Sequence, residues 1–587
     1  MSRLTVAEQL QITAISAERK RREVLSRLLQ VPPFRWRFGD GRIEQLLIVP
    51  QDLRTPDPSL WLEIRHGQFG LAGSLARLEG RSPFDIVPPS RDWQRALHGF
   101  GWLRHLHATD DPAAFEAARQ LAIEWVVRNA SGAGRSWHPD VLARRVISWL
   151  SHAGVLLEGA DEASYDVITA SLARQLVRLS SSWRETPAGR PRLMALTALV
   201  LADLCVAGHD SRLPTDVPVF VDELRRQILP DGGHVSRNPS VLVELLLDFL
   251  PLRECFRARS HPVPPALAEA IADMLAMLRH LRLGDGLLAR FNGVGIASPA
   301  SLGTVLAYAE FAAKPLTAAE ASGYVRLERG ETVVVADCGS PPPMPLAGEA
   351  GAGCASFELS SGRELILANG GFPGAANADW VPAARSTASH NTLVLGEVSS
   401  SRLIIDRRLE NLLPGKPLRG PGNVTVTRIG SGNASSLDED MPGLDSDELQ
   451  SDSDDVAGFE VCHDGYLQQF GVLHRRRVTL EATGRRIVGN DWLKPPRGVM
   501  RHKQDVPFAI HFHLFPGVKC ERAGRVGSMT IATATQRWRF VAEGARVSIE
   551  ESMHFADSIG PLKSVQIVLR GASYGEIEVR WALTRLA

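Results

Sequence analysis

The feature that most constrains the fold of this chain is a change in its hydrophobic period near residue 320. From about residue 110 to 315, apolar residues recur every three or four positions, and Pro, Gly or Asn marks several segment ends. From about residue 320 onward, many short segments alternate apolar with polar residues and are separated by Gly, Asn, Asp and Ser turns. The pattern predicts an antiparallel helical array followed by an antiparallel β-sandwich.

The balanced charge of the chain argues against nucleic acid as a partner. The chain has 587 residues, with 66 Lys and Arg balanced by 66 Asp and Glu, so no global field favours nucleic acid. Any attraction to an anionic ligand must therefore be local. The cysteines lie apart, without the paired spacing of a zinc or redox motif, and are expected to be free thiols at positions 205, 255, 338, 354, 462 and 520.

No segment has the character of a membrane span or an export signal. The most apolar run begins at Leu193, but it is shorter than the roughly 20 residues that cross a bilayer, and it contains Asp203. It is interpreted as a buried helix. The N-terminal residues up to Gln30 lack a continuous apolar stretch, so we expect no signal peptide and a cytoplasmic location.

We expect three parts along the chain. Residues 1–90 form an N-terminal extension and entry segment, residues 91–315 the helical domain, and residues 316–587 the sandwich. Within the sandwich, residues 436–458 are acidic, with no basic residue and few bulky apolar ones. This stretch is predicted to be a solvated, disordered loop. A calcium loop is the alternative, although the ordered ligand spacing of such a loop is missing.

Several motifs together resemble those of heparinase II/III-like proteins, a polysaccharide-lyase superfamily. In the first half they are LLIVPQDLRTPDPSL, GRSPFDIVPPS, WQRALHGFGWLRHL, WHPDVLARRVISW and ILPDGGHVSRNPS. In the second half they include GEAGAGCASFELSSGRELILANGG, ARSTASHNTLVL, CHDGYLQQFGVLHRRRVTL and FAIHFHLFPGV. The resemblance covers nearly the whole chain. It implies an α+β multidomain fold in which an N-terminal incomplete (α/α) toroid precedes a C-terminal antiparallel β-sandwich.

The resemblance also implies a chemistry. Family lyases cleave uronate-containing polysaccharides by β-elimination, which requires neutralising the uronate carboxylate, removing the C5 proton and protonating the departing oxygen. Asn, Gln, Arg or His can serve the first role, because they stabilise the charge that develops on the carboxylate. Tyr and His usually serve as base and acid, because burial and neighbouring charges tune their proton affinity.

Family members often bind zinc in the sandwich through two histidines and an aspartate. Only His390, in the H-N-T motif, matches those ligands in this chain. Gly351 and Asn369 fall near the other two positions, and neither is a good zinc ligand. The resemblance therefore implies no standard zinc site, and no other cofactor is expected.

The toroid departs from the family pattern as well. Val241 and Leu242 fall near the positions of the catalytic Tyr and the His that follows it. Arg190 and Arg192 stand where an Asn-Asn-His segment is expected. Both catalytic positions of the toroid are therefore unmatched.

Candidate site residues in the sandwich centre on His390, which lies where a polar loop becomes a strand. Arg385 precedes it and supplies donors, and Asn369 is expected to contact substrate. Tyr466 and His474 are the other catalytic candidates, since a gap of eight residues puts both on one face of an unbroken strand. Structural alternatives are a turn histidine kept after loss of the metal, for His390, and a core tyrosine, for Tyr466.

Candidate substrate contacts in the toroid lie in a short polar loop that contains His234, Arg237 and Asn238. Functional residues often lie on such loops. Asn238 followed by Pro239 is also a common start of a helix, with Asn as the N-cap and Pro at the first helical position. The cap is the favoured interpretation of Asn238, whereas His234 and Arg237 are interpreted as substrate contacts.

The sequence thus leads to two hypotheses. The first is a polysaccharide lyase-like enzyme that cleaves a uronate-containing acidic glycan by β-elimination. The second is a non-catalytic glycan-binding or cell-envelope polysaccharide assembly protein that has lost the metal and the toroid catalytic residues. Either would bind an acidic polysaccharide or oligosaccharide, and neither needs nucleic acid or an integral membrane segment. Because family lyases usually meet polymer outside the cytoplasm, a periplasmic location is the alternative to a cytoplasmic one.

Overall fold

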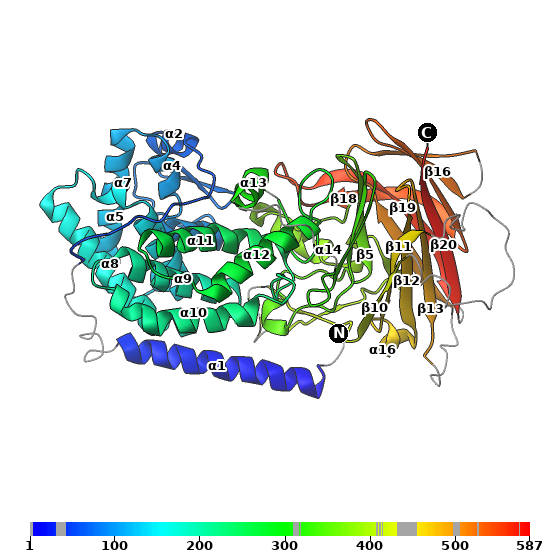
Figure 1. Cartoon of the computed structure of the whole chain (residues 1–587), viewed down its shortest axis with the longest axis horizontal. Helices are drawn as coiled ribbons and strands as arrows, with labels where there is room; N and C mark the ends of the chain where they lie inside the picture. Colours follow the sequence, from blue (N-terminus) through cyan, green and yellow to red (C-terminus); the bar gives the residue numbers. More distant parts are fainter. Residues whose placement is uncertain are drawn as a thin grey trace.

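The structure is a computed structural model of the whole chain. It describes residues 4–30, 43–296, 298–308, 316, 318–406, 409, 413, 415–430, 455–496, 505–524, 527–573 and 576–586. Figure 1 shows a helical domain followed along the long axis by a domain of strands. The change of period in the sequence therefore corresponds to a change of architecture, from an N-terminal helical toroid to C-terminal antiparallel sheets.

Helices of the toroid pack around one apolar core, into which Trp93, Trp102, Trp125 and Trp149 are buried. Several begin at a side-chain cap, such as Asp111, whose carboxylate accepts the backbone N–H of Ala113. In chain order the helices are α2 (Ser59–Arg65), α3 (Arg91–Gly99), α4 (Leu103–His107), α5 (Pro112–Arg128), α6 (Pro139–Ser151), α7 (Ala153–Leu157), α8 (Glu162–Ser182), α9 (Arg190–Cys205), α10 (Leu213–Gln227), α11 (Pro239–Ala258), α12 (Pro265–His280) and α13 (Pro299–Ala307).

The most apolar run of the sequence is α9, which is buried as predicted, with Asp203 also buried within it. Within the described ranges, no helix combines the length and apolarity needed to cross a membrane. The helical period of the sequence runs through residues 141–159 without interruption, but the structure divides this segment at His152 into α6 and α7.

In the described residues, the sandwich has one eight-stranded sheet, two four-stranded sheets and a two-stranded sheet of β8 (Arg402–Leu403) and β9 (Leu418–Arg419), all antiparallel. The large sheet has the order β10 (Val424–Ile429), β11 (Val456–His463), β12 (Leu473–Glu481), β13 (Arg486–Lys494), β20 (Ile577–Arg585), β17 (Arg537–Glu543), β16 (Ser528–Ala532) and β15 (Lys519–Arg522). One smaller sheet has the order β18 (Arg546–His554), β19 (Leu562–Ser573), β14 (Val506–His513) and β7 (Leu393–Leu395). The other has the order β3 (Tyr324–Arg329), β4 (Thr332–Asp337), β5 (Ser356–Ser361) and β6 (Glu364–Leu367).

Strand β4 joins the two domains, because every one of its residues is buried. Val333 and Val335 on one face belong to the core of the toroid, whereas Val334 and Ala336 on the other face belong to the core of the sandwich. A strand covered on both faces must be apolar on both, which accounts for its run of valines.

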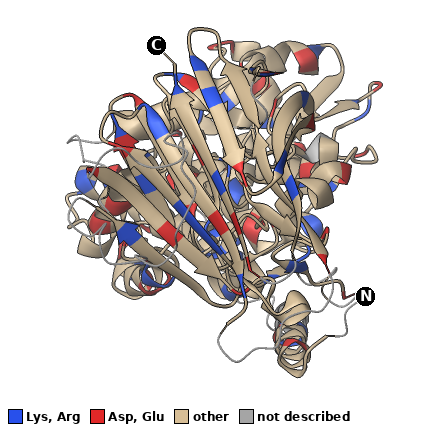
Figure 2. Ribbon diagram, turned by 90° about the vertical axis from the view of Figure 1, so that its right-hand side faces the viewer, with Lys and Arg blue, Asp and Glu red and all other residues tan. Residues whose placement is uncertain are grey.

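Charges are mixed over the sandwich. Viewed from the end of the sandwich, the described strands carry Lys and Arg interspersed with Asp and Glu (Figure 2). This agrees with the zero net charge of the sequence. The hypothesis of a disordered loop at residues 436–458 falls mostly on residues that the structure does not describe, but Val456 to Gly458 begin β11 instead.

Helix α1 (Val6–Gln30) lies outside both domains and runs along them, below α9 and α10 in Figure 1. Its first turn is a capping box, in which the N–H of Thr5 donates to Glu8 Oε2 (2.6 Å) and the N–H of Glu8 donates to Thr5 Oγ1 (3.3 Å).

Candidate functional site

His390 lies in a closed pocket of the sandwich and does not face open solvent. Its Nδ1–H donates to the carbonyl of Ser386 (2.7 Å), so Nε2 is left as the acceptor. The backbone of Gly351 and Gly353 covers the ring. A Cβ on Gly351 would lie 2.7 Å from Nε2, and one on Gly353 would lie 2.5 Å from Cδ2. Burial lowers the pKa of His390, so the imidazole stays neutral at neutral pH.

The residues around His390 do not fit a zinc ion. Gly351 offers no side chain to a metal, and a Cβ at that position would lie 2.7 Å from His390 Nε2. Asn369 is fully buried, and its Oδ1 accepts the N–H of Asn391 (2.8 Å). Within the described ranges, no three His, Cys, Asp or Glu side chains are grouped to hold a metal.

Arg385 supports the loop that lies against His390. Its guanidinium is buried and donates to the carbonyls of Ala350 (2.7 Å) and Ala347 (2.9 Å). Burial lowers the pKa of Arg385 to about 10, against an opposing effect of Glu349. Arg385 therefore holds backbone groups together, and its predicted contact with substrate stays a prediction.

Arg237 and Asn238 connect the toroid to the sandwich. The buried guanidinium of Arg237 pairs with Asp337 (2.5 Å) and donates to the carbonyls of Ser322 (2.7 Å) and Ser340 (2.9 Å). Asn238 caps α11 as the sequence indicates, with its Oδ1 accepting the N–H of Ser240 (2.9 Å). Its amide also donates to Glu349 (2.9 Å). The side chains of Arg237 and Asn238 thus both bind other groups of the protein.

His234 has partners on both ring nitrogens. Its Nδ1 accepts the N–H of Ser236 (3.1 Å), and Nε2–H donates to Gln227 Oε1 (3.0 Å). Burial, with the nearby charge of Arg190, lowers the pKa of His234 to about 3. The ring is therefore a neutral, internal group.

Tyr466 and His474 lie in the core of the sandwich and do not share a strand. A short helix, α16 (Leu467–Phe470), separates Tyr466 from the start of β12. The Tyr466 hydroxyl donates to the carbonyl of Leu393 (2.7 Å). The expectation of one unbroken strand face was wrong, because Gly471 adopts a left-handed conformation (φ 69°) that turns the chain there.

His474 belongs to a chain of hydrogen bonds that runs from Gly465 to Asp491. One choice of tautomer for His463 and His474 satisfies every bond in it. The N–H of Gly465 donates to His463 Nδ1 (3.2 Å), His463 Nε2–H donates to His474 Nδ1 (3.0 Å), and His474 Nε2–H donates to Asp491 (2.7 Å). Asp491 also accepts from Arg476 (2.8 Å). His474 is fully buried, so this network has no direct access for a glycan.

A different polar group lies on and near the first turns of several toroid helices. We call it the toroid mouth and define it as Arg95 of α3, His138 and Asp140 at the start of α6, Arg190 at the start of α9, and Glu244 of α11. The side chains of Arg95, His138, Arg190 and Glu244 are 52%, 53%, 43% and 43% exposed. The toroid mouth is thus accessible where the predicted residues are not.

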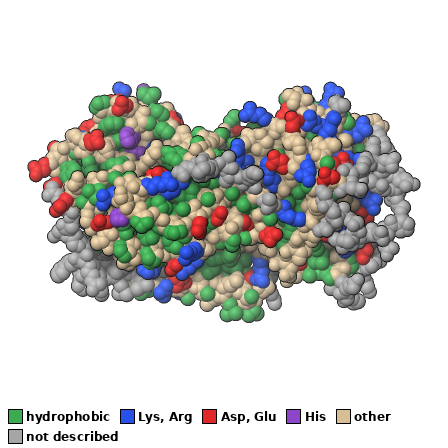
Figure 3. Space-filling model, in the orientation of Figure 1, with side chains coloured by type: hydrophobic (Ala, Val, Ile, Leu, Met, Phe, Trp, Pro, Cys, Tyr) green, Lys and Arg blue, Asp and Glu red, His purple; other side chains and the backbone are tan. Residues whose placement is uncertain are grey.

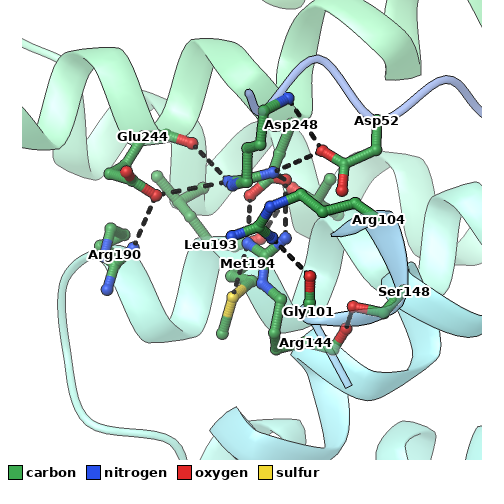
Figure 4. A network of polar contacts seen from close by, with 12 residues as sticks. Asp52, Gly101, Arg104, Arg144, Ser148, Arg190, Leu193, Met194, Glu244 and Asp248 are labelled. Atoms are coloured by element: carbon green, nitrogen blue, oxygen red, sulfur yellow. Dashed lines mark hydrogen bonds and ion pairs between the residues drawn. The ribbon is translucent and has the colours of Figure 1, made fainter. Parts of the chain in front are cut away.

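A buried base supports the toroid mouth (Figure 4). Asp248 accepts from Arg54 (2.9 Å) and from Arg144 (2.7 Å), and Arg54 also reaches Glu244 (3.4 Å). Burial alone would raise the pKa of Asp248, but Arg144 and Arg54 lower it to about 2. The base is therefore a set of buried ion pairs that reaches the toroid mouth through the contact of Arg54 with Glu244, which in turn contacts Arg190.

Two exposed arginines of the toroid mouth lie near each other. The charge of Arg190 lowers the pKa of Arg95, although burial is the larger cause. Arg95 pairs with Asp140, and Arg190 has a single contact to Glu244 (3.3 Å). An arginine at the first turn of a helix is unfavourable next to the positive end of the helix dipole. Like charges held together in this way are suited to binding an anion.

His138 is the titratable ring of the toroid mouth. Its Nδ1–H donates to Asp140 (2.5 Å), which leaves Nε2 on the exposed side. Burial, then Arg95, then Arg19 lower the pKa of His138 to about 4. The ring is therefore neutral at neutral pH and a weak base.

In the sequence, Arg190 stands out only as a departure from the family pattern. Its position is a further signal, because the helix dipole disfavours a cation at the start of a helix. The local sequence around Arg95 and His138 gives no comparable indication of a site, since the two side chains come close only through the packing of α3 against α6.

Solved structures share this architecture of helical toroid and antiparallel sandwich. Heparinase III aligns with a TM-score of 0.63 at 12% identity, covering 88% of this chain and 80% of that one. A heparan sulfate lyase HepC mutant from Pedobacter heparinus aligns with a TM-score of 0.57 at 14% identity, covering 91% of this chain and 84% of that one. The chain therefore shares the fold of these two proteins, a helical toroid followed by an antiparallel sandwich.

Sequence relatives narrow the class to a family. The family described as "Heparinase II/III-like, C-terminal" matches residues 312–582. FtsZ-localized protein C of Caulobacter vibrioides is 31% identical over 567 residues, which cover 94% of this chain and 92% of that protein. The chain belongs to the heparinase II/III-like family, as its motifs predicted.

Proposed function

We propose that this protein binds an acidic, uronate-containing glycan at the toroid mouth and does not cleave it. The observation that carries the proposal is the closure of the Gly351 and Gly353 backbone over His390. Gly351 and Gly353 offer no side chain to a metal beside His390, while the side chains of Arg95 and Arg190 in the toroid mouth stay about half exposed.

Binding is supported by the charges of the toroid mouth. A guanidinium can hold a carboxylate through two parallel hydrogen bonds, and Arg190 and Arg95 each have a large part of the side chain in solvent. Since the base beneath them is fixed by Asp248, binding would cost little ordering of the site.

The proton affinities of the candidate residues support the proposed absence of turnover. β-Elimination needs a base whose pKa lies near the working pH. His138 has a pKa of about 4, and Tyr466 and His474 are buried with internal partners. His138, the accessible imidazole of the proposed site, is therefore poorly matched to removing the C5 proton at neutral pH.

The experiment tests binding and cleavage on the same samples. Heparan sulfate, hyaluronan, polygalacturonate and alginate are each incubated with the native chain, and polymer retention and the absorbance of unsaturated products are followed. We expect retention of at least one polymer without product. Sustained product formation would overturn the proposal in favour of a lyase, and failure to retain any polymer would reject glycan binding.

Variants of the toroid mouth locate the site. Arg190→Glu and Arg95→Glu should each weaken retention by roughly tenfold or more, because a repulsive carboxylate replaces a cation. Arg546→Glu is the matched control, since it makes the same charge change at an exposed position of the sandwich. Equal loss in all three would point to a non-specific charge effect.

The Caulobacter relative supports a place of action. Its name states that it is localised with FtsZ. We propose the same location for this chain, consistent with a role in polysaccharide assembly at the cell envelope. A fluorescently tagged chain should coincide with FtsZ in the native host, and a uniform distribution would count against this part of the proposal.

A further inference from the structure

Four guanidinium groups and three carboxylates converge at the base of the toroid mouth (Figure 4). We call them the arginine cluster and define it as Arg54, Arg104, Arg144 and Arg190 with Asp52, Glu244 and Asp248. Burial alone would raise the pKa of each carboxyl group, but hydrogen bonds and nearby cations hold all three pKa values below their usual range. The three are therefore ionised at neutral pH, and four cations against three anions leave a surplus of one positive charge.

Arg104 is the cation of the cluster that has no carboxylate partner. The other three arginines each donate to a carboxylate of the cluster. Arg104 instead donates through Nη1 to the carbonyl of Gly101 (2.7 Å). In the part of the chain that the structure describes, Arg104 forms no ion pair, and its Nε–H is buried without an acceptor. An unused buried donor on a cation is costly, and an oxyanion would offset that cost.

The guanidinium of Arg104 points into the arginine cluster. Figure 4 shows it reaching between the side chains of Arg54 and Arg144. Burial lowers the pKa of Arg104, the charge of Asp52 raises it, and the charges of Arg54 and Arg144 lower it further. Gly101 uses Nη1, which leaves the edge formed by Nε and Nη2. That edge of a guanidinium is suited to holding two oxygens of a carboxylate or a sulfate through parallel hydrogen bonds.

The arginine cluster opens at Arg190 and Glu244. The side chains of both are 43% exposed, whereas those of Arg144, Arg54 and Asp248 are 20%, 12% and 4% exposed. The exposed fraction thus falls from the toroid mouth inward. A small acidic group would enter from the exposed side.

The open side of the cluster lies near the sandwich. A Cβ on Gly189, the residue before Arg190, would lie 2.7 Å from Leu346 Cδ2. At the start of α11, the amide of Asn238 donates to Glu349 (2.9 Å). Figure 3 shows the outline of the molecule hollowed between its two lobes. A ligand lying along the junction of the domains would therefore present its acidic groups to this side.

We propose that the arginine cluster is an oxyanion site, in which Arg104 binds one carboxylate or sulfate group and Arg54 and Arg144 supply the surrounding positive charge. The inference rests on the proposed function for the identity of the ligand, because the cluster lies at the base of the toroid mouth. A neutral sugar would gain nothing from the surplus charge. The site therefore selects the acidic group of the glycan, and a small oxyanion can occupy it without the polymer.

Small anions test the site without a polymer. Sodium sulfate and sodium glucuronate are titrated calorimetrically into the native chain, with sodium chloride holding the ionic strength constant and glucose as the neutral control. We expect one site per chain for at least one anion and none for glucose. Binding of sulfate alone would identify a sulfated group as the ligand, and binding of glucuronate alone would identify a uronate. Failure of both anions to bind would overturn the oxyanion site.

Variants test the role of Arg104. Arg104→Gln should weaken anion binding by roughly tenfold or more, because it removes the unpaired charge. Arg104→Lys should retain part of the affinity, since it keeps the charge but not the planar fork. Glu244→Gln should tighten binding, because it adds to the surplus charge. Arg119→Gln is the matched control, since Arg119 is another buried arginine of the toroid that donates to backbone carbonyls, those of Leu156 (3.2 Å) and Glu158 (2.6 Å).

Thermal unfolding separates a ligand role of Arg104 from a structural one. An anion that binds only the folded chain raises its unfolding temperature. The oxyanion site predicts that Arg104→Gln unfolds no earlier than the native chain without anion, and that the rise caused by the bound anion is lost. If Arg104 serves only to hold the Gly101 carbonyl, the variant should unfold earlier and still respond to the anion. An equal rise in the native chain and in Arg104→Gln would overturn the proposal.

Polymer retention distinguishes this inference from the proposed function. Retention of a polymer by both the native chain and Arg104→Gln, without binding of either small anion, would reject the oxyanion site and leave glycan binding at the exposed arginines. Anion binding that Arg104→Gln abolishes, with no polymer retained, would keep the site for a free oxyanion and reject the proposed glycan.

Discussion

Two glycines take the place of side chains at the position where His390 would meet a metal. Gly351 and Gly353 allow the loop to lie directly on the imidazole, which a Cβ at either position would prevent. The closed pocket is thus a property of small residues, and it can be tested by adding a single methyl group.

Gly353→Ala should destabilise the protein by about 1–3 kcal/mol, because the new Cβ would lie 2.5 Å from His390 Cδ2. The free energy of unfolding in urea measures this. In the double variant Gly353→Ala, His390→Ala, removal of the ring should recover part of the loss as a coupling energy. Gly303→Ala in α13 is the control, since its Cβ meets nothing within 4 Å. Additive effects of the two substitutions would contradict the contact.

Arg237→Ala should cost about 3–5 kcal/mol, because it leaves Asp337 buried without its cation. Arg570→Ala breaks an ion pair whose side chains are 52% and 31% exposed, and it should cost less than about 1 kcal/mol. Thermal and urea unfolding compare the two. A small loss for Arg237→Ala would mean that this pair does not hold the toroid to the sandwich.

At the scale of elements, the contact between α9 and α10 contains a pair of acids. Burial, followed by the charge and hydrogen bond of Asp216, raises the pKa of Asp203 to about 8. A carboxyl group whose pKa is raised on folding stabilises the fold below its unfolded pKa and loses that contribution as pH rises towards the folded pKa. The affected window runs from about pH 4 to about pH 8.

Asp203→Asn should therefore become progressively more stable than the native chain between pH 5 and pH 8. The difference should grow by up to about 1.4 kcal/mol per pH unit, and it should level off above pH 8. Urea unfolding at several pH values measures it. A difference that stays constant across this range would show that Asp203 does not titrate there.

Elements with strong periodicity could be predicted from the sequence, and α9 and β4 show why. Each is apolar over its whole length and is buried, so local pattern and tertiary position agree. The break between α6 and α7 could not be predicted, because the apolar periodicity continues through His152. The turn before β12 could not be predicted either, because it depends on the left-handed conformation of Gly471.

Site residues were harder to predict for a related reason. His234, Arg237, Tyr466 and His474 are polar residues in a plausible pattern, but burial turns each into an internal partner of the fold. The toroid mouth instead depends on side chains from four helices, far apart in the sequence. Of these residues, only Arg190 can be recognised from its local sequence, because it is a cation at the start of a helix, where the helix dipole disfavours one.

For the whole molecule, binding at the toroid mouth should depend on ionic strength. Arg95 and Arg190 are largely exposed, so salt screens their attraction to a carboxylate. We expect affinity to fall as salt rises from 50 mM to 500 mM, and to fall less in Arg190→Glu. Affinity that does not change with salt would indicate an apolar binding mode elsewhere on the surface.

Calorimetric titration of a uronate oligosaccharide into the native chain tests binding without cleavage most directly. Binding alone should give heats that decay to zero once the sites fill, with a defined end point that Arg190→Glu weakens. Heat that continues after each injection until the oligosaccharide is consumed would reveal turnover and contradict a non-catalytic site. A titration without any binding heat, at more than one temperature, would contradict glycan binding itself.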